Sequence, residues 1–453
     1  MLVVLCVCVW NVSRSLVVNE PQKQQQPTQV MKAWNYPTLS MTTDNWRRLL
    51  IVSASLLTLL AISCPASGNP AALSSSSERF ALRLATSLGL SQPHSNVAIS
   101  PLLLQSALTL LYTGVADDAT AVARQLRVAL DLQHLGTGEQ ALQQFQQLIA
   151  QLKESSAIGC KLRLLSEFYT DERYTFNYRD AFMMRAATLG IGMHRLDFDN
   201  VPNVANAINY EFLARSNYSV GELVTSSMLH ATTGSDTPFL HVSALTFDAP
   251  WAQGFDPQQT QRINFFSHGH SPKLVDAMFV QHSFRYAELP ALDACIIELP
   301  YASAELSLFI IYPNQLEGLA KLERQLSTYD LQQLRHALSE RKLALTLPKF
   351  SLLAHTELHQ ILQHLGLDKL FSSEAQLHKV FSSILASSAP HLTAVPHTAL
   401  FEVKEAGGQK DRTFAAAFTD LFRSTLSLVI NHPFFYALGN GKSVLLAGHV
   451  VDI

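Results

Sequence analysis

The spacing of apolar residues predicts several helices in the first half of the chain. Apolar positions recur three and four residues apart, which is the period of an amphipathic helix. The segments with this pattern are residues 80–90, 102–114, 118–130, 139–151 and 201–216. They predict helices packed around a common core, and the nearly uncharged, Gln-rich outer face of 139–151 offers no site for a polyanion.

Strands are predicted in the middle and at the end of the chain. Residues 397–405 alternate, with His397, Ala399, Phe401 and Val403 on one face. The other strand-like runs are 162–170, 239–247, 294–301, 305–313 and the C-terminal pieces LSLVI, FFYAL and SVLLAGHVV, the last two joined by an Asn440-Gly441 turn. Strands and helices mix without a regular βαβ repeat or a Pro/Gly-rich linker, so we predict one large α+β domain.

The N-terminal part has the layout of a secretory signal. Trp46, Arg47 and Arg48 precede the apolar run 49–62, and the small residues Ala66, Ser67 and Gly68 follow it. The run is shorter than the ~20 residues of a membrane-spanning helix, so we expect cleavage and export. Because a Gln-rich piece precedes the signal, translation from Met1 and from Met41 both remain open.

These features divide the chain in two. Residues 1–68 form an N-terminal extension with the signal core at 46–68, and residues 69–453 form a single domain. With 48% hydrophobic and 15% charged residues, the chain can bury a large core. A formal net charge of −3 gives no basic field for phosphates, so we expect neither a nucleic-acid partner nor, after cleavage, a membrane anchor.

Two cysteines, Cys160 and Cys295, follow the predicted signal. No disulfide framework is encoded, and both a single bridge and two buried free thiols remain open. Asn217-Tyr218-Ser219 fits the N-glycosylation pattern, which suits a surface loop of an exported protein.

Enzyme motifs are missing from the sequence. There is no G-x-S-x-G, P-loop, G-x-G-x-x-G or H-E-x-x-H. His355 and His359 could share a helix face, but Glu357 is out of register for a metalloprotease base, so we interpret them as a solvated face. His268 and His270 are interpreted in the same way. We therefore expect no enzyme activity, no metal and no cofactor.

One family resemblance spans nearly all residues from about Ser76 onward. The segment NVAISPLLLQSALTLLYTGVADDATAVARQL (96–126) is similar to the signature of the serpins, the serine protease inhibitors. Further segments agree in order and spacing, namely LHVSALTFDAPWAQGFDPQQTQRINFF, IIELPY, residues 347–371, HPFFYAL and KSVLLAGHVV. The resemblance implies one α+β domain with three β-sheets, about nine helices and an exposed reactive-centre loop, and we expect a monomer.

The resemblance implies that the loop is bait for a protease. After cleavage, the loop of a serpin inserts into the main sheet as an extra strand and traps the protease covalently. Aligned on PHTALFEVKEAG, the loop spans about residues 407–424, after Glu405. Candidates for the cleaved bond are Leu421, Phe422 and Arg423-Ser424, and the last suits a trypsin-like protease.

The start of the loop departs from the inhibitory pattern of small residues. With Gly407 as the hinge, Lys410 and Arg412 would face the core, and with Gly408 as the hinge, Gln409 and Asp411 would. Burying an unpaired charge costs several kcal/mol, so either register opposes rapid insertion.

The resemblance also places Ser100, Ser243, His397 and Trp251 in a cluster that governs sheet opening. Leu103 replaces a second serine of this cluster, and Ser243 stands where an asparagine is usual. Two hypotheses follow from these observations. One is a secreted inhibitor of a trypsin-like or chymotrypsin-like protease, and the other is a non-inhibitory extracellular binding or carrier protein, or a protease substrate.

Overall fold

The computed structural model describes residues 70–115, 117–155, 160–173, 176–233, 239–302, 306–382, 390–405 and 426–453. The chain divides into two units, Met1–Ala66 and Ser67–Ile453, and all described residues lie in the second unit. The predicted signal therefore lies outside the described residues. Within the described ranges, no helix is both long enough and apolar enough to cross a membrane.

Ten α-helices occur among the described residues. They are α3 (Pro70–Ser91), α4 (Pro101–Gly114), α5 (Ala121–Ala129), α6 (Gly138–Ser155), α7 (Asp180–Leu189), α8 (Val201–Arg215), α9 (Ser226–Thr233), α10 (Leu319–Leu326), α11 (Leu331–His336) and α12 (His359–His364). Short 3₁₀ turns lie at Pro257–Gln259, Pro290–Leu292, Asp368–Phe371 and Ser373–Ala375. The predicted helices at 80–90, 102–114, 118–130, 139–151 and 201–216 are all present.

The helix ends follow local sequence. Ser100 caps α4 by accepting the backbone N–H of Leu103, and Pro101 occupies the first turn, where its missing N–H costs nothing. Asn200 caps α8 in the same way through the N–H of Asn203. These caps fix where α4 and α8 begin, and both helices pack against the sheet described next.

A five-stranded sheet forms one part of the fold. Its order is β10 (Phe350–Glu357), β11 (Pro396–Val403), β4 (Phe239–Asp248), β2 (Lys161–Asp171) and β3 (Gly192–Leu196). The pairs β11–β4 and β2–β3 are parallel, and the other pairs are antiparallel.

The remaining strands form a nine-stranded sheet. They are β1 (Val97–Ile99), β5 (Gln261–Ser267), β6 (Ser271–Leu289), β7 (Ala294–Pro300), β8 (Ser307–Pro313), β9 (Ser339–Pro348), β12 (Leu426–Val429), β13 (Phe434–Gly439) and β14 (Val444–Val450). β6 is 19 residues long and pairs with β5, β7 and β9. Three sheets were expected, and the described strands form two hydrogen-bonded sheets. The long β6 pairs with β5 near its start and with β7 near its end, and so joins these strands into one sheet.

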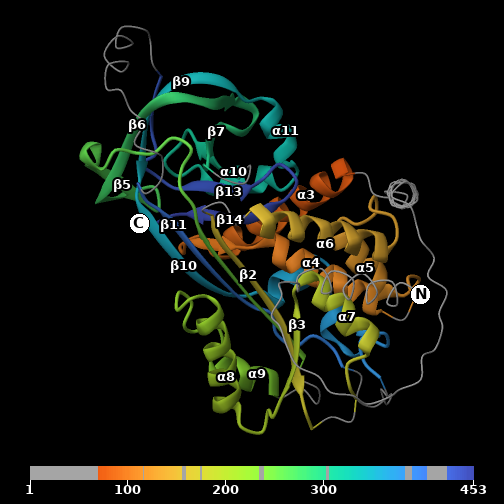
Figure 1. Cartoon of the computed structure of the whole chain (residues 1–453). Coiled ribbons are helices and arrows are strands. Elements are labelled where there is room, and N and C mark those ends of the chain that lie inside the picture. Colours follow the sequence, from red (N-terminus) through yellow and green to blue (C-terminus); the bar gives the residue numbers. More distant parts are fainter. Residues whose placement is uncertain are drawn as a thin grey trace, which may run out of the picture. The chain divides into compact units, whose positions relative to one another are not determined.

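The five-stranded sheet is covered on both faces. On β4, Leu240, Val242 and Ala244 pack with α8 in one apolar cluster, whereas Phe239 and Leu245 belong to the main core. This follows from the alternation of side chains along a strand. In Figure 1, α8 and α9 lie on one side of β2 and β3, and α4 to α7 group on the other.

Candidate functional site: the seam between β4 and β11

The chain enters the predicted reactive loop directly from β11. β11 ends at Val403, and the chain is described up to Glu405 and again from Leu426, where β12 begins in the other sheet. The predicted hinge and bond residues lie outside the described residues. They are Gly407, Gly408, Lys410, Arg412, Leu421, Phe422, Arg423 and Ser424.

β11 and β4 form a parallel seam in the middle of the five-stranded sheet. The register runs from His397 opposite Ser243 to Phe401 opposite Phe247. We call these two paired stretches, residues 243–247 and 397–401, the β4–β11 seam. A strand that turned back from the end of β11 would run antiparallel to both of them.

His397 joins the two strands of the seam to α4. The backbone N–H of Ser100 donates to His397 Nε2 at 3.0 Å, and His397 Nδ1 lies 2.9 Å from Ser243 Oγ. Because Nε2 accepts a hydrogen bond, we assign the proton of the neutral ring to Nδ1, which donates to Ser243. Burial lowers the pKa of His397 to about 3, so the ring is neutral near pH 7.

The structure brings three of the four predicted cluster residues together. Ser100, Ser243 and His397 are all buried and form one hydrogen-bonded chain. Leu103, which replaces a serine, contributes its backbone N–H to Ser100 Oγ at 3.4 Å and its side chain to the core. Trp251, the fourth predicted residue, makes no hydrogen bond to these three.

A second buried histidine beside the seam was missed in the sequence. His241 precedes Ser243 by two residues on β4, so both side chains point to the same face, and its Nε2 lies 2.9 Å from Ser166 Oγ on β2. Burial, and next to it the neighbouring His397, lower the pKa of His241 to about 3. The only signal in the sequence was its place in an apolar strand, where a polar side chain that faces the core needs a hydrogen-bond partner.

Trp251 lies at the end of the seam nearest the loop. Its Nε1–H donates to the carbonyl oxygen of Lys404 at 2.8 Å, and its ring stacks on Tyr301 with centroids 4.3 Å apart. Trp251 follows β4 and Lys404 follows β11, so this bond closes the seam at its C-terminal end.

Glu405, the last described residue before the loop, is also held. Its Oε1 accepts from Thr260 Oγ1 at 2.8 Å and lies 3.0 Å from Lys349 Nζ. Partial burial favours the neutral acid, but hydrogen bonds from its own backbone, Lys349 and Thr260 outweigh this and hold the pKa of Glu405 below its ordinary value. The start of the loop is therefore anchored to the segment between β9 and β10.

The histidines weighed as metal ligands do not share a helix face. His355 lies on β10, where its Nδ1 is 2.9 Å from Thr398 Oγ1, whereas His359 begins α12 and stacks on Phe371. The helical interpretation was wrong because Phe350, Leu352 and Thr356 are buried at period two, which makes the segment a strand up to Glu357.

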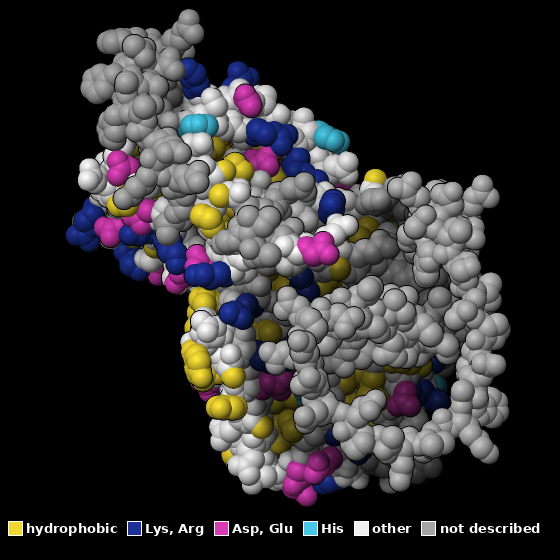
Figure 2. Space-filling model, viewed as in Figure 1, with side chains coloured by type: hydrophobic (Ala, Val, Ile, Leu, Met, Phe, Trp, Pro, Cys, Tyr) yellow, Lys and Arg dark blue, Asp and Glu magenta, His cyan; other side chains and the backbone are white. Residues whose placement is uncertain are grey.

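Other predicted features lie at separate places. Cys160 and Cys295 are both buried, and no disulfide bridge joins them. Asn217 is exposed directly after α8, with a φ of 59°. On the face seen in Figure 2, Lys and Arg side chains lie next to Asp and Glu, and ion pairs such as Lys161–Asp248 reflect this mixing.

A cavity of about 320 Å³ lies elsewhere in the fold, and none of its lining residues belongs to the β4–β11 seam. Arg285 is paired with Glu298 at 2.7 Å, and Arg335 lies over the Phe309 ring and pairs with Glu78. The full lining is Arg285, Glu298, Ser307, Phe309, Gln332, Arg335, His336, Gly439, Asn440 and Gly441.

Comparison with known proteins identifies the family. The family model "Serpin (serine protease inhibitor)" matches residues 75–453, and this chain belongs to the serpin family. Serine protease inhibitor 42Dd of Drosophila melanogaster is 26% identical, covering 81% of this chain and 93% of the relative. The human leukocyte elastase inhibitor is 27% identical, covering 82% and 96% respectively.

Solved structures of other proteins have the same fold. Uncleaved ovalbumin matches with a TM-score of 0.72 at 22% identity, over 84% of this chain and 100% of that chain. Human thyroxine-binding globulin complexed with thyroxine matches with a TM-score of 0.70 at 19% identity, over 84% and 98%. These two likenesses show the fold alone.

Proposed function

We propose that this chain is a secreted serpin that inhibits a serine protease through a bait loop at about residues 407–424. The β4–β11 seam carries the proposal, because the loop continues from β11 and only one sharp turn would bring it between two parallel strands. An inserted strand would be antiparallel to both neighbours, the pairing that a tight reversal allows.

The proposed target is a protease of trypsin-like or chymotrypsin-like specificity. Arg423-Ser424 suits a pocket with an acidic base, and Leu421 or Phe422 suits an apolar pocket. The relatives named above support a protease partner, since one is named an inhibitor of leukocyte elastase. Incubation with trypsin and chymotrypsin should yield an adduct that survives SDS, and Arg423→Ala should abolish the trypsin adduct alone if Arg423 is the recognised residue.

Insertion is tested by comparing the intact chain with a chain nicked near Arg423. A rise of the melting temperature by tens of degrees after nicking is the expected result, because insertion adds a central strand to the sheet. An unchanged melting temperature would contradict the proposal. A rise that appears only in the double variant Lys410→Ala, Arg412→Ala would then show that the charged hinge residues prevent insertion of the loop.

A carrier role is the second candidate, and the cavity of about 320 Å³ favours it. The volume lies at the lower end for small-molecule sites, and the lining combines the Phe309 ring with polar groups of Arg285 and Arg335. A dye with an apolar body and a sulfonate, anilinonaphthalene sulfonate, should bind there. His336→Trp at the lining should weaken binding, whereas His364→Trp on the exposed side of α12 should not.

Export is proposed from the signal layout at 46–68, and glycosylation from the sequon at Asn217. Secretion from animal cells should yield a chain that begins near Asn69. Digestion with a peptide N-glycosidase should lower its apparent mass, and the Asn217→Gln variant should not respond. Retention of the chain inside the cells would overturn the export proposal.

A further inference from the structure

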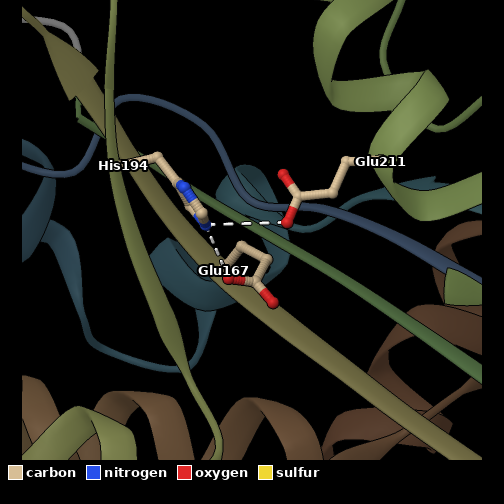
Figure 3. Close-up of side chains that lie close together, drawn as sticks. All are labelled: Glu167, His194 and Glu211. Carbon is tan, nitrogen blue, oxygen red and sulfur yellow. Dashed lines mark hydrogen bonds and ion pairs between the residues drawn. The ribbon is translucent and has the colours of Figure 1, made fainter.

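Three metal-ligating side chains converge between the five-stranded sheet and α8. Glu167 lies on β2 and His194 on β3, and both belong to the positions that face α8, which carries Glu211. Figure 3 shows the imidazole between the two carboxylates. The three residues come from three separate elements, so only the folded chain assembles them.

The distances suit a small four-coordinate ion. His194 Nε2 lies 2.9 Å from Glu167 Oε2 and 3.7 Å from Glu211 Oε1, and the three ligand atoms are all within 4.8 Å of one another. Two ligands of a tetrahedral zinc ion, with bonds of about 2.0–2.1 Å, stand roughly 3.3–3.4 Å apart. The two separations from His194 Nε2 bracket that value, and the third, between the two carboxylates, is at most 4.8 Å, so modest side-chain shifts would bring the carboxylate oxygens together around the ion.

The carboxylates are oriented by groups behind them. Tyr169 Oη donates to Glu211 Oε2 at 2.8 Å, and the Tyr169 ring stacks on His194 with centroids 5.0 Å apart. Arg215 contacts Glu167 Oε1, the oxygen that points away from His194. The Tyr169 hydroxyl is an outer partner of the kind that holds ligands in place around protein-bound metals.

Gly192 supplies the room for the Glu167 carboxylate. It lies opposite Glu167 in the β2–β3 register, and a Cβ at this position would collide with Glu167 Oε2 and lie 2.8 Å from His194 Nε2. The Glu167 side chain is 1% exposed, while those of His194 and Glu211 are 35% and 29% exposed. Solvent can therefore reach the ligands from one side and provide a fourth ligand.

Charge favours a cation at this place. Among the residues that the structure describes, Arg215 is the permanent cation that pairs with the two carboxylates, so the group with a neutral imidazole has one excess negative charge. Arg215 also lies 2.9 Å from Glu211 Oε1, one of the three ligand atoms, and is therefore the competitor that an ion must displace from that oxygen.

We propose that Glu167, His194 and Glu211 bind one zinc ion, with water as the fourth ligand. One imidazole with carboxylates suits zinc better than Ca²⁺ or Mg²⁺, which prefer all-oxygen sites. The bound ion fastens α8 to β2 and β3 and stabilises the domain, whether or not the loop inserts.

The test is a titration of the chelator-treated, full exported chain with zinc chloride at about pH 8, where ligand protons compete least. We expect one zinc ion per chain by calorimetry and a higher melting temperature with zinc. His194→Gln should lower the affinity by more than about 100-fold, because loss of an outer partner alone costs 10- to 100-fold. Cobalt should give the intense visible absorption of a four-coordinate ion.

Two further variants make the test specific. Arg215→Gln removes the competing cation and should strengthen zinc binding, an effect that mere loss of folding would not produce. His270→Gln is the matched control, because the exposed His270 lies close to the half-buried His268, with ring centroids 6.4 Å apart. Zinc binding that survives His194→Gln but disappears in His270→Gln, or the lack of any stoichiometric binding, would overturn the proposal.

Discussion

Ser243 and His397 face each other across two parallel strands, with Ser243 Oγ 2.9 Å from His397 Nδ1. Neighbouring strands lie about 4.8 Å apart, so a strand inserted between them would double their separation and break this bond. The bond therefore belongs only to the closed seam. Any serpin-like insertion in this chain has to give it up.

Removing the Ser243 hydroxyl should destabilise the closed form. Ser243→Ala leaves the buried Nδ1–H of His397 without an acceptor, and we expect a loss of about 1–3 kcal/mol in the free energy of unfolding. Urea denaturation at pH 7 measures it. Ser351→Ala on the exposed face of β10 is the control and should change stability by less than about 0.5 kcal/mol. Equal effects of the two substitutions would show that the bond does not stabilise the seam.

The free energy of unfolding should decrease as the pH is lowered, because His397 is buried in its neutral form. Its pKa is about 3 in the folded chain and about 6.5 when unfolded, so below pH 6.5 protons bind the unfolded chain preferentially. Its contribution declines as pH falls from 6.5 toward 3, by up to about 1.4 kcal/mol per pH unit. The stability difference between the wild-type chain and His397→Gln should therefore shrink between pH 7 and pH 4.

Comparison of the two chains isolates His397 together with its effect on the pKa of His241. Glu78, whose burial raises its pKa to about 7, contributes to both chains and cancels in the difference. Urea midpoints at several pH values provide the measurement. Parallel curves for the two chains would mean that His397 does not titrate differently on unfolding.

The sequence predicted the elements better than their partners. The alternation in 397–405 identified the buried face of β11, but nothing local indicates that β4, about 150 residues earlier, is its neighbour. The family resemblance supplied that link for Ser100, Ser243 and His397. Strand pairing between distant segments depends on the whole core, and a single-sequence pattern does not contain it.

The group around Glu167 shows the same limit. Glu167 interrupts an apolar strand and so gives no sign of its partners, and Gly192 and His194 lie in a short strand that the pattern did not reveal. Glu211 and Arg215 have the spacing of an ordinary solvated helix face. Only the packing of α8 on the sheet turns these separate residues into one group.

The ion pair between Lys349 and Glu405, at the base of the loop, should stabilise the fold modestly. Lys349→Met removes the cation that pairs with Glu405, and we expect the free energy of unfolding to fall by about 0.5–1 kcal/mol at pH 7. The pKa of Glu405 is lowered, so its contribution is present above its unfolded pKa of about 4.5 and is lost as pH falls through the lower folded value. The difference from wild type should therefore disappear in strong acid.

Heat denaturation at pH 7 and at about pH 3 provides the comparison for this ion pair. Lys161→Met serves as the control, because Lys161 is 77% exposed and pairs with Asp248 at 3.4 Å. An exposed pair of this kind should contribute almost nothing. A Lys349→Met effect that persists unchanged in acid would assign it to packing of the Lys349 methylenes rather than to charge.

Trp251 should report the state of the seam by fluorescence. The chain has four tryptophans, Trp10, Trp34, Trp46 and Trp251, so a chain that begins at Asn69 retains only Trp251. Its Nε1–H is bonded to Lys404, immediately after β11, and its ring is buried against Tyr301. If nicking near Arg423 lets a strand enter the seam, Lys404 moves away from Trp251. The emission spectrum should then shift as the stability rises.

Two variants separate this signal from other changes. Trp251→Phe should lose the emission and about 1 kcal/mol of stability, since the ring stack remains but the half-buried Lys404 carbonyl loses its donor. Ser243→Ala should speed the emission change after nicking, because the bond to His397 that opposes opening is already absent. A large gain in heat stability without any change in Trp251 emission would mean that an inserting strand leaves the Trp251–Lys404 contact intact, and the seam would then open only at its other end.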